Sequence, residues 1–309
     1  MIKYVARRIL YSLLVTFGVL VFVFFMVQMV GDPVKLMLPS DVPESVYLEM
    51  REALGFNDPL PVRFIREVGG WVRGDFGDSL WQQIPALPLA LERIPRTLFL
   101  TAVTLAMAVP VALALGSYSA VRPNSLVDRF LTGVSLAGIS VADFWLGMML
   151  ILVFAVNLDL LPTSGFGGYT GFEYVILPAL ALAFRPIGRI AQVARSALVE
   201  EMEKPYILTA RSKGLTEGQV VRRHALRNAM IPTLTVVGDE TATFLNGAVV
   251  IETIFAWPGI GQLFIQAIER RDLPLISACV FVVALMTITL NLIVDLAYAG
   301  VDSRARVAK

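Results

Sequence analysis

Long apolar stretches recur along the chain and are separated by short polar segments. A helix that spans a membrane needs about 20 mostly apolar residues, and several segments meet this requirement. They are residues 9–30, 97–120, 130–156, 175–199, 233–253 and 275–299. The first is too long for the apolar part of a secretory signal, and Gly31-Asp32-Pro33 offers no cleavage site, so it is read as a retained anchor. The pattern therefore predicts an all-α membrane protein with six transmembrane helices.

Shorter helices are predicted between these stretches. Pro43–Leu54 and Pro61–Val72 each place proline in the first turn, and apolar residues recur at helical spacing in the second. Ile260–Ile268 forms an amphipathic stripe. The first two either lie on the membrane surface or form a platform for a soluble protein. The third is either a lid over the outer mouth or a belt at the interface.

The same pattern divides the chain into two parts. Residues 1–96 hold the first transmembrane helix and a long external segment with short helices. Residues 97–309 form a five-helix core, which contains a polar loop at about residues 205–232.

Composition supports a lipid environment. The chain has 309 residues, of which 56% are hydrophobic and 17% charged, and its mean hydropathy is +0.70. A soluble domain carries about 25% charged residues. The net charge of +1 gives no reason to expect nucleic acid. One cysteine, Cys279, and one histidine, His224, exclude a disulfide framework and a histidine or thiolate metal site.

Lysine and arginine in the loops set the orientation. They concentrate at both termini, between the second and third spans, and in the polar loop. Short loops with such an excess face the cytoplasm. Both termini and the polar loop are therefore expected in the cytoplasm.

The polar loop contains a predicted short helix. Thr216 and Gln219 have the spacing of a capping box, and Leu215 and Val220 that of a hydrophobic staple. The helix is expected to run to about Asn228 and to end before Pro232. It either lies on anionic lipid headgroups or docks into a groove of a soluble partner. In the second case Val220, Val221, Ala225 and Leu226 are the expected apolar anchors.

Polar side chains also occur at membrane depth, where ionised groups usually face a bundle interior or a cavity. The predicted translocation-pathway residues are Asp143, Arg185, Arg189, Asp239, Glu240, Thr243 and Asn246. They either neutralise one another, through an Arg185–Asp239 or Arg185–Asp143 pair, or line a polar route that contacts cargo. We hypothesise that Asp239 and Glu240 favour passage of a cation or of a peptide amino terminus, which neutral variants of both residues would test.

The polar loop resembles a known family. Tyr206–Gly214 followed by Arg223–Asn228 is similar to the EAA loop of ABC-importer permeases, in the branch that serves dipeptides, oligopeptides and nickel. Leu208 and Thr209 stand where Glu and Ala are usual, and Arg227 stands where proline often follows. Other pieces match the branch in order: Gly74–Ser79, Leu161–Gly165, Gly247–Glu252, Trp257–Gly261 and Asn291–Tyr298.

The resemblance implies a type I ABC-importer permease fold, with a cytoplasmic coupling helix and external amphipathic helices. The coupling residues that it implies are Ala210, Gly214, Leu215, Thr216, Gln219, Val220, Arg223, His224, Leu226 and Asn228. The external gate that we predict consists of Trp257, Pro258, Gly259, Gly261 and Phe264.

The resemblance also implies partners. These are a second homologous permease subunit that forms a heterodimer, two cytoplasmic ATPase domains that bind ATP and Mg, an extracytoplasmic substrate-binding protein, and the lipid bilayer of a bacterial inner membrane. No G-x-x-x-x-G-K-[ST] sequence occurs in the chain, so no cofactor is expected on it.

Two other functions fit the sequence less well. A proton- or sodium-coupled transporter would use the buried acids, but no internal repeat of the kind common in such proteins is visible. An intramembrane enzyme is disfavoured because no H-E-x-x-H or G-x-S-x-G sequence occurs.

Overall fold

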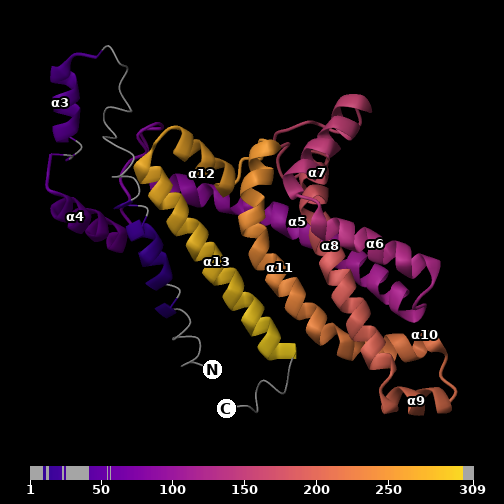
Figure 1. Ribbon diagram of the computed structural model, residues 1–309. Helices are drawn as coiled ribbons and strands as arrows, with labels where there is room; N and C mark the ends of the chain where they lie inside the picture. Colours follow the sequence, from indigo (N-terminus) through magenta and orange to yellow (C-terminus); the bar gives the residue numbers. More distant parts are fainter. Residues whose placement is uncertain are drawn as a thin grey trace. The chain divides into compact units, whose positions relative to one another are not determined.

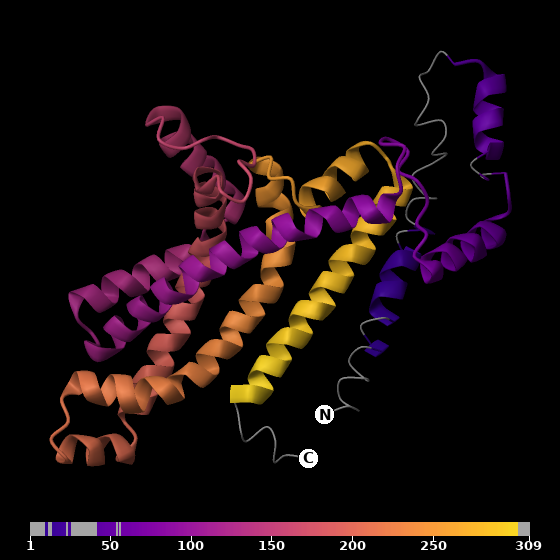
Figure 2. The same ribbon diagram turned by 180° about the vertical axis from the view of Figure 1, so that it is seen from behind.

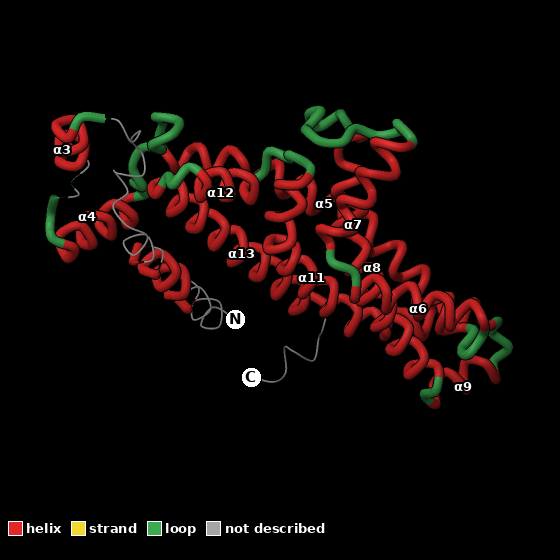
Figure 3. Tube along the Cα trace, turned by 45° about the horizontal axis from the view of Figure 1, so that its top comes forward, coloured by secondary structure: helices red, strands yellow, loops and turns green. Residues whose placement is uncertain are grey.

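The structure, a computed structural model, describes residues 10–11, 14–22, 24–25, 42–53, 55 and 57–301. The predicted first span, 9–30, lies largely outside the described residues. Where the chain is described it is helical, and Figure 3 shows helices joined by loops. The extended pairing recorded in these residues is one isolated bridge between Asp78 and Pro85. The predicted all-α class is confirmed.

The chain divides into two compact units. One comprises the residues up to Arg96 together with Gly259–Thr289, and the other comprises Thr97–Pro258 together with the residues from Leu290 onward. The boundary after Arg96 coincides with the predicted division of the sequence. Gly259–Thr289 groups with the first unit, however, and not with the predicted five-helix core.

The first unit contains the predicted short helices. The helices α3 (Glu44–Ala53) and α4 (Leu60–Arg73) confirm that the two predicted short helices form, and α12 (Ile260–Glu269) confirms the amphipathic one. Gly74 ends α4 with a φ of 75°, a left-handed conformation that glycine adopts without strain. Ile260, Leu263 and Ala267 are buried, so the apolar stripe of α12 packs within the protein.

Asp272 organises the loop after α4. Its carboxylate is fully buried and accepts hydrogen bonds from the Ser79 hydroxyl at 2.5 Å and from the Trp81 N–H at 3.1 Å. It also accepts the Leu275 N–H at 3.1 Å, in the first turn of α13 (Leu273–Val301). A buried carboxylate is stable only with such partners. Asp272 therefore ties the Gly74–Ser79 loop to the start of α13.

The second unit is built around α8 (Phe172–Met202), which packs against other helices of the unit (Figures 1 and 2). These are α6 (Leu126–Ser140), α7 (Asp143–Leu150) and α11 (Leu226–Ile254). Gly188 of α8 approaches Ser135 of α6 so closely that an added Cβ would lie 2.4 Å from the Ser135 carbonyl oxygen. Small residues thus permit the close helix contacts that stabilise membrane bundles.

Three described helices are long and apolar enough to cross a membrane. They are α5 (Ala86–Val121), α8, and Leu273–Val294 of α13. Their positions agree with the second, fourth and sixth predicted spans. α11 covers the fifth predicted span and extends beyond both of its ends.

The prediction that 130–156 is one continuous helix is wrong. The chain leaves the helical conformation at Val141, and the helices before and after this residue are bent by 104°. The second of them continues from α7 into a π-helical stretch, η1 (Ile151–Asn157). This bent pair counts as a fourth crossing only if it is one broken span.

The prediction that Pro232 ends a helix is also wrong. The polar loop forms α9 (Pro205–Ser212), α10 (Glu217–Val220) and the π-helical η2 (Val221–Ala225), and the last runs directly into α11. Pro232 lies inside α11 and removes one donor from it. A membrane helix tolerates this loss where neighbouring groups satisfy the freed carbonyl.

Candidate functional site

The segment from Pro205 to Ala225, here named the α9–η2 segment, lies at the end of α8 and α11 that is remote from α7 (Figure 1). Its apolar residues form a core with the ends of three long helices. The buried members of this cluster are Ala120, Leu198, Ile207, Ala210, Val220, Val221, Ala225 and Ala229. The segment is therefore fastened to α5, α8 and α11.

This burial corrects the predicted anchors. The exposed fractions of Val220, Val221 and Ala225 are 0%, 8% and 0%. They point into the chain's own core and are not available to a partner. The sequence pattern showed that the helix has an apolar face, but not which surface covers it.

The other predicted coupling residues divide by exposure. Ala210 is buried in the same cluster, and Leu215, His224 and Leu226 are partly buried. The exposed residues are Gly214, Thr216, Gln219, Arg223 and Asn228. Leu208, which was not predicted as a site residue, is the most exposed large apolar side chain of α9 at 58%.

Polar contacts join the start of the segment to both α8 and α11. The Tyr206 hydroxyl donates to Glu201 of α8 at 2.5 Å and accepts from the Asn228 amide of α11 at 3.0 Å. Lys204 also donates to Glu201, which raises the pKa of its ammonium group. Burial, and then donation to Glu201, raise the pKa of Tyr206. Both groups therefore stay protonated at neutral pH.

The predicted start of α10 is confirmed. The Thr216 N–H donates to Gln219 Oε1 at 3.1 Å, as a capping box requires. Leu215 packs against the cluster that contains Val220, which agrees with the predicted staple. Arg211 and Glu217 form two hydrogen bonds, at 2.7 and 3.2 Å, across the turn between α9 and α10. Gly214 makes that turn possible with a φ of 81°.

A second group of residues joins α7, α8 and α11 at membrane depth. Glu240 Oε1 accepts a hydrogen bond from Arg189 at 2.9 Å, and its Oε2 lies 3.5 Å from Arg185 Nη2. Each arginine faces a further carboxylate at 3.9 Å: Arg185 faces Asp143, and Arg189 faces Asp239. The charges thus alternate in the order Asp143, Arg185, Glu240, Arg189, Asp239. We name this arrangement the ionic chain.

The ionic chain contains one of the two predicted pairs. Arg185 meets Asp143, as one alternative expected, but Asp239 pairs with Arg189 and not with Arg185. Glu240 is the central acid, and its side chain is fully buried. It is therefore held by arginines and is not exposed to a passing solute, whereas 64% of the Asp239 side chain is exposed.

Exposed polar side chains continue along α8 and α11. Arg189, Gln192 and Ser196 recur on one face of α8, and Thr235 and Asp239 lie on the exposed face of α11. Thr243 donates to the backbone carbonyl of Asp239 at 2.9 Å. Asn246 lies on α11, but its side chain is outside what the structure describes. Such stripes on membrane-spanning helices need a polar environment or a partner.

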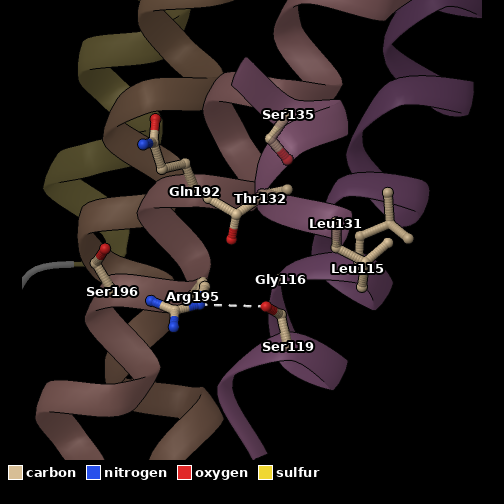
Figure 4. Close-up of a pocket in the computed structure, with 10 residues that line it drawn as sticks. Leu115, Gly116, Ser119, Leu131, Thr132, Ser135, Gln192, Arg195 and Ser196 are labelled. Atoms are coloured by element: carbon tan, nitrogen blue, oxygen red, sulfur yellow. Dashed lines mark hydrogen bonds between the residues drawn. The ribbon is translucent and has the colours of Figure 1, made fainter. Parts of the chain in front are cut away.

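An ion pair that the sequence did not predict joins the α5–α6 turn to α8. Arg195 binds Asp128 through two hydrogen bonds of 2.7 Å, and Ser119 also donates to Asp128. The Arg195 Nε donates to Ser119 at 3.2 Å (Figure 4). A bidentate arginine–carboxylate contact fixes orientation as well as distance. The available signal was that Asp128 follows the helix-capping residue Ser125 by three positions.

A small pocket with both polar and apolar lining residues lies beside this ion pair. Figure 4 shows Thr132 and Ser135 of α6 facing Gln192, Arg195 and Ser196 of α8. Its volume is about 90 Å³, which is room for a few water molecules. Gln192 and Ser196 also belong to the exposed stripe of α8, so the pocket continues that stripe.

Aromatic residues close the opposite end of the second unit. Trp257 is 1% exposed and packs edge-on against Phe166, with ring centroids 4.8 Å apart, and parallel to Phe99 at 6.3 Å. The Gly165 N–H donates to the Phe255 carbonyl at 2.8 Å. Nearby, Thr97 donates to the buried Glu252 at 2.6 Å. Trp257 is therefore part of a packed cluster.

The predicted gate residues fall into both compact units. Trp257 and Pro258 belong to the second unit, and Gly259, Gly261 and Phe264 to the first. Gly259 and Gly261 are buried, and Phe264 is half-buried. Sequence proximity alone had grouped them.

Comparison with known proteins identifies the family. Residues 112–307 match the model of the family described as "Binding-protein-dependent transport system inner membrane component". This range begins within α5 and covers α6 to α13, including the α9–η2 segment and all five residues of the ionic chain. The chain belongs to this family.

Relatives match the permease over nearly its whole length. "Oligopeptide transport system permease protein AppB" of Bacillus subtilis (strain 168) is 36% identical, over 98% of this chain and 99% of the relative. "Glutathione transport system permease protein GsiC" of Escherichia coli (strain K12) is 37% identical, over 99% of each chain. "Di/tripeptide transport system permease protein DppB" of Pseudomonas aeruginosa (strain UCBPP-PA14) is 36% identical, also over 99% of each.

A solved structure supports the fold. The permease is similar to a chain in a crystal structure of an amino acid ABC transporter with histidines, with a TM-score of 0.51 and 16% identity. The match covers 69% of this permease and 94% of the other chain.

The family and the relatives establish the function of this chain. The permease is a multi-pass membrane subunit of an ATP-driven ABC importer that works with a binding protein and an ATPase. The resemblance noted in the polar loop is confirmed. The alternative of a proton- or sodium-coupled transporter finds no support among the relatives, which are named as permeases of transport systems.

Proposed function

We propose that this permease forms one half of the pathway through which a bacterial inner membrane importer moves peptides or related small solutes. The second half is a homologous permease subunit, and two cytoplasmic ATPase domains bind ATP and Mg and supply the work. The relatives support the cargo class, since their names specify oligopeptides, glutathione and di- or tripeptides. The missing phosphate-binding sequence supports placing ATP hydrolysis on partners.

The α9–η2 segment is the element that receives the ATPase. This assignment rests on the two sides of the segment. Its apolar side packs on α5, α8 and α11, and its outer side is exposed. A partner that moves the outer side therefore moves the ends of three long helices with it. Leu208 supplies an exposed apolar contact, and Arg222 and Arg223 supply exposed positive charge.

This role corrects the docking mode expected from the sequence. The apolar residues of η2 hold the segment to the permease, while α9 and the arginines face the partner. Gly214, Thr216, Gln219, Arg223 and Asn228 remain candidates for direct contact because they are exposed. Ala210, Leu215, Val220, His224 and Leu226 act through the packing of the segment.

Charge reversal on the outer side tests the docking. Leu208→Glu and Arg223→Glu are introduced into the full transporter, and ATP-dependent uptake into proteoliposomes is measured together with co-purification of the ATPase subunits. Both variants are expected to lower uptake at least tenfold and to weaken co-purification. Leu160→Glu is the matched control, because Leu160 is 67% exposed in the loop between η1 and α8, away from the α9–η2 segment. Unchanged coupling in Leu208→Glu and Arg223→Glu would refute the assignment.

The exposed stripes of α8 and α11 are the surface that faces the translocation pathway and the second subunit. Arg189, Gln192 and Asp239 are exposed on long helices at membrane depth, where lipid contact is unfavourable. A facing subunit of the same family would enclose them. Cysteines placed at Gln192 and at Thr235 are expected to cross-link to the second subunit or to react with a solute-sized thiol reagent. If neither cysteine cross-links or reacts, the assignment of this surface to the pathway and the subunit interface is refuted.

The aromatic cluster of Trp257, Phe99 and Phe166 closes the pathway on the external side. Trp257 fills the space between Phe99 and Phe166, and Pro258, Gly259, Gly261 and Phe264 continue the chain from it. Trp257→Ala is expected to permit a slow uptake of small solutes without ATP, and vesicles that remain tight would argue against a gate here.

The external helices are the docking platform for the binding protein. α4 leaves Val62, Ile65 and Val72 exposed, at 49%, 70% and 83%. Ile65→Glu is expected to abolish stimulation of ATP hydrolysis by the loaded binding protein. If these side chains only rest on the membrane surface, that stimulation will persist.

A further inference from the structure

The ionic chain carries one more negative than positive charge. Three carboxylates, Asp143, Glu240 and Asp239, share the two guanidinium groups of Arg185 and Arg189. Glu240 takes the short contact with Arg189 at 2.9 Å, and its Oε2 receives no hydrogen bond from the described residues. The arginine charge is therefore concentrated on the buried centre of the chain.

Asp239 is the acid whose negative charge is least neutralised by the arginines. Its carboxylate lies 3.9 Å from Arg189 Nη2, beyond hydrogen-bond distance, and 64% of its side chain is exposed. Asp143, at the other end, is 25% exposed. The surplus negative charge of the ionic chain therefore faces outward at Asp239.

This charge lies near the middle of a long helix. Asp239 is 13 residues from the start of α11 and 15 from its end, which corresponds to about 20 Å on each side at 1.5 Å per residue. An exposed carboxylate at that depth is unfavourable in lipid and lies in a cavity or meets a cation. The position on the exposed stripe of α11 places it on the pathway proposed above.

We propose that Asp239 binds the primary ammonium group of the cargo, which in a peptide is the free amino terminus. This assignment rests on the proposed peptide import and specifies what the pathway recognises. Arg189 acts as a positioning residue: Glu240 holds its guanidinium 3.9 Å from Asp239, where it orients the carboxylate without occupying it.

An ammonium group fits this site better than a metal ion. No cluster of three or more histidine, cysteine or acidic side chains that could hold a metal occurs among the described residues. Two of the three nearby carboxylates are turned toward arginines. The two oxygens of one exposed carboxylate can accept hydrogen bonds from an ammonium group, which carries three N–H donors.

Binding to the assembled transporter tests the proposal without interference from the binding protein. The complete complex is placed in nanodiscs, with and without ATP and vanadate, and the binding protein is omitted. The probes are tri-alanine with a fluorophore at its carboxyl end and the same molecule acetylated at its amino end. Fluorescence anisotropy gives the affinity of the wild type, Asp239→Asn and Asp239→Glu. Asp159→Asn is the control, because Asp159 is exposed in a loop where asparagine is equally tolerated.

The wild type is expected to prefer the free-amine probe. Asp239→Asn should lower the affinity for that probe about tenfold, the effect of losing one charge-assisted hydrogen bond. The affinity for the acetylated probe should not change. Asp239→Glu should restore part of the affinity. No binding of the free-amine probe, equal binding of both probes, or unaltered binding in Asp239→Asn each overturns the proposal.

Two further outcomes separate the causes. If Asp239 instead pairs with a basic side chain of the second subunit, Asp239→Asn will lower the melting temperature of the complex and will change the affinities for both probes by the same factor. That outcome overturns the proposal. Uptake of tri-alanine into proteoliposomes with the binding protein present is measured in parallel. If the wild type takes up tri-alanine and Asp239→Asn does not alter binding of the probes, only the role of Asp239 is refuted. If the wild type takes up no tri-alanine, peptide import itself is refuted.

Discussion

Glu240 and Asp239 are neighbours in sequence and have opposite surroundings. A helix turns by about 100° per residue, so two adjacent side chains point to different faces. Glu240 points between α8 and α11 and is fully buried, while Asp239 remains 64% exposed. The same two acids therefore serve different purposes: Glu240 stabilises the bundle, and Asp239 is exposed on the side of α11 that we propose faces the pathway.

This contrast predicts unequal effects on stability. Glu240→Gln leaves Arg185 and Arg189 without their shared buried acid, and the free energy of unfolding should fall by up to about 3 kcal/mol. Asp239→Asn removes a long, exposed contact worth little. Thermal unfolding of the purified permease in detergent should show a lower melting temperature for the first variant only, and equal melting temperatures would contradict the placement of Glu240.

The sequence could identify the charged residues of the ionic chain but not their pairing. Helical spacing showed that Arg185 and Arg189 share a face, since they are four residues apart. Which acid meets which arginine depends on how α8 rotates and slides against α11, and that is set by the packing of small residues along α8. The proposed Arg185–Asp239 pair was wrong for this reason.

The Asp128–Arg195 pair makes a second prediction at this scale. Arg195→Lys keeps the charge but cannot form both 2.7 Å bonds, so the unfolding free energy should fall by about 1–2 kcal/mol. Arg129→Lys is the matched control and should be neutral, because Arg129 follows Asp128 on α6 and is exposed. A melting temperature that is the same in both variants would mean that the bidentate geometry contributes nothing.

At the scale of elements, the long apolar helices were predictable and their interruptions were not. The stretch 130–156 contains no proline, and Ser140-Val141-Ala142 has no residue that breaks a helix by itself. The bend there follows from packing against α8 and α11, which propensity does not describe. Pro232 shows the reverse: a residue that should break a helix lies inside one.

The turn between α9 and α10 gives a prediction about a single element. Gly214 has a φ of 81°, and an added Cβ would meet no atom within 4 Å, so Gly214→Ala is opposed by backbone strain alone, about 1–2 kcal/mol. Gly218 is equally open but helical, so Gly218→Ala should stabilise α10 by about 0.5–1 kcal/mol. Amide hydrogen exchange across residues 205–225 should become faster in the first variant and slower in the second. The same direction of change in both would contradict the assigned conformations.

At the scale of the molecule, sequence and structure contribute different parts. Hydropathy identified the spans that the structure describes, because the bilayer imposes their length on the sequence. It did not identify how the α9–η2 segment attaches, because an apolar helix face looks the same whether the chain itself or a partner covers it. The structure settles that for Val220, Val221 and Ala225, and the exposed side then becomes the candidate docking surface.

Membrane orientation supplies the last prediction. α8 has 31 residues and a length of about 46 Å, enough to place its two ends on opposite sides of a bilayer. Ser164, before α8, and Ser212, in the α9–η2 segment after it, are both exposed. The excess of lysine and arginine assigns the Ser212 side to the cytoplasm.

Single serine-to-cysteine variants can test this because the chain's only cysteine, Cys279, is buried. In intact spheroplasts, a membrane-impermeant maleimide should label Ser164→Cys at once and Ser212→Cys only after the membrane is opened. The unaltered chain reports any background from Cys279. The reverse pattern would place the α9–η2 segment outside the cell, where no ATPase could reach it, and would overturn the docking role proposed for it.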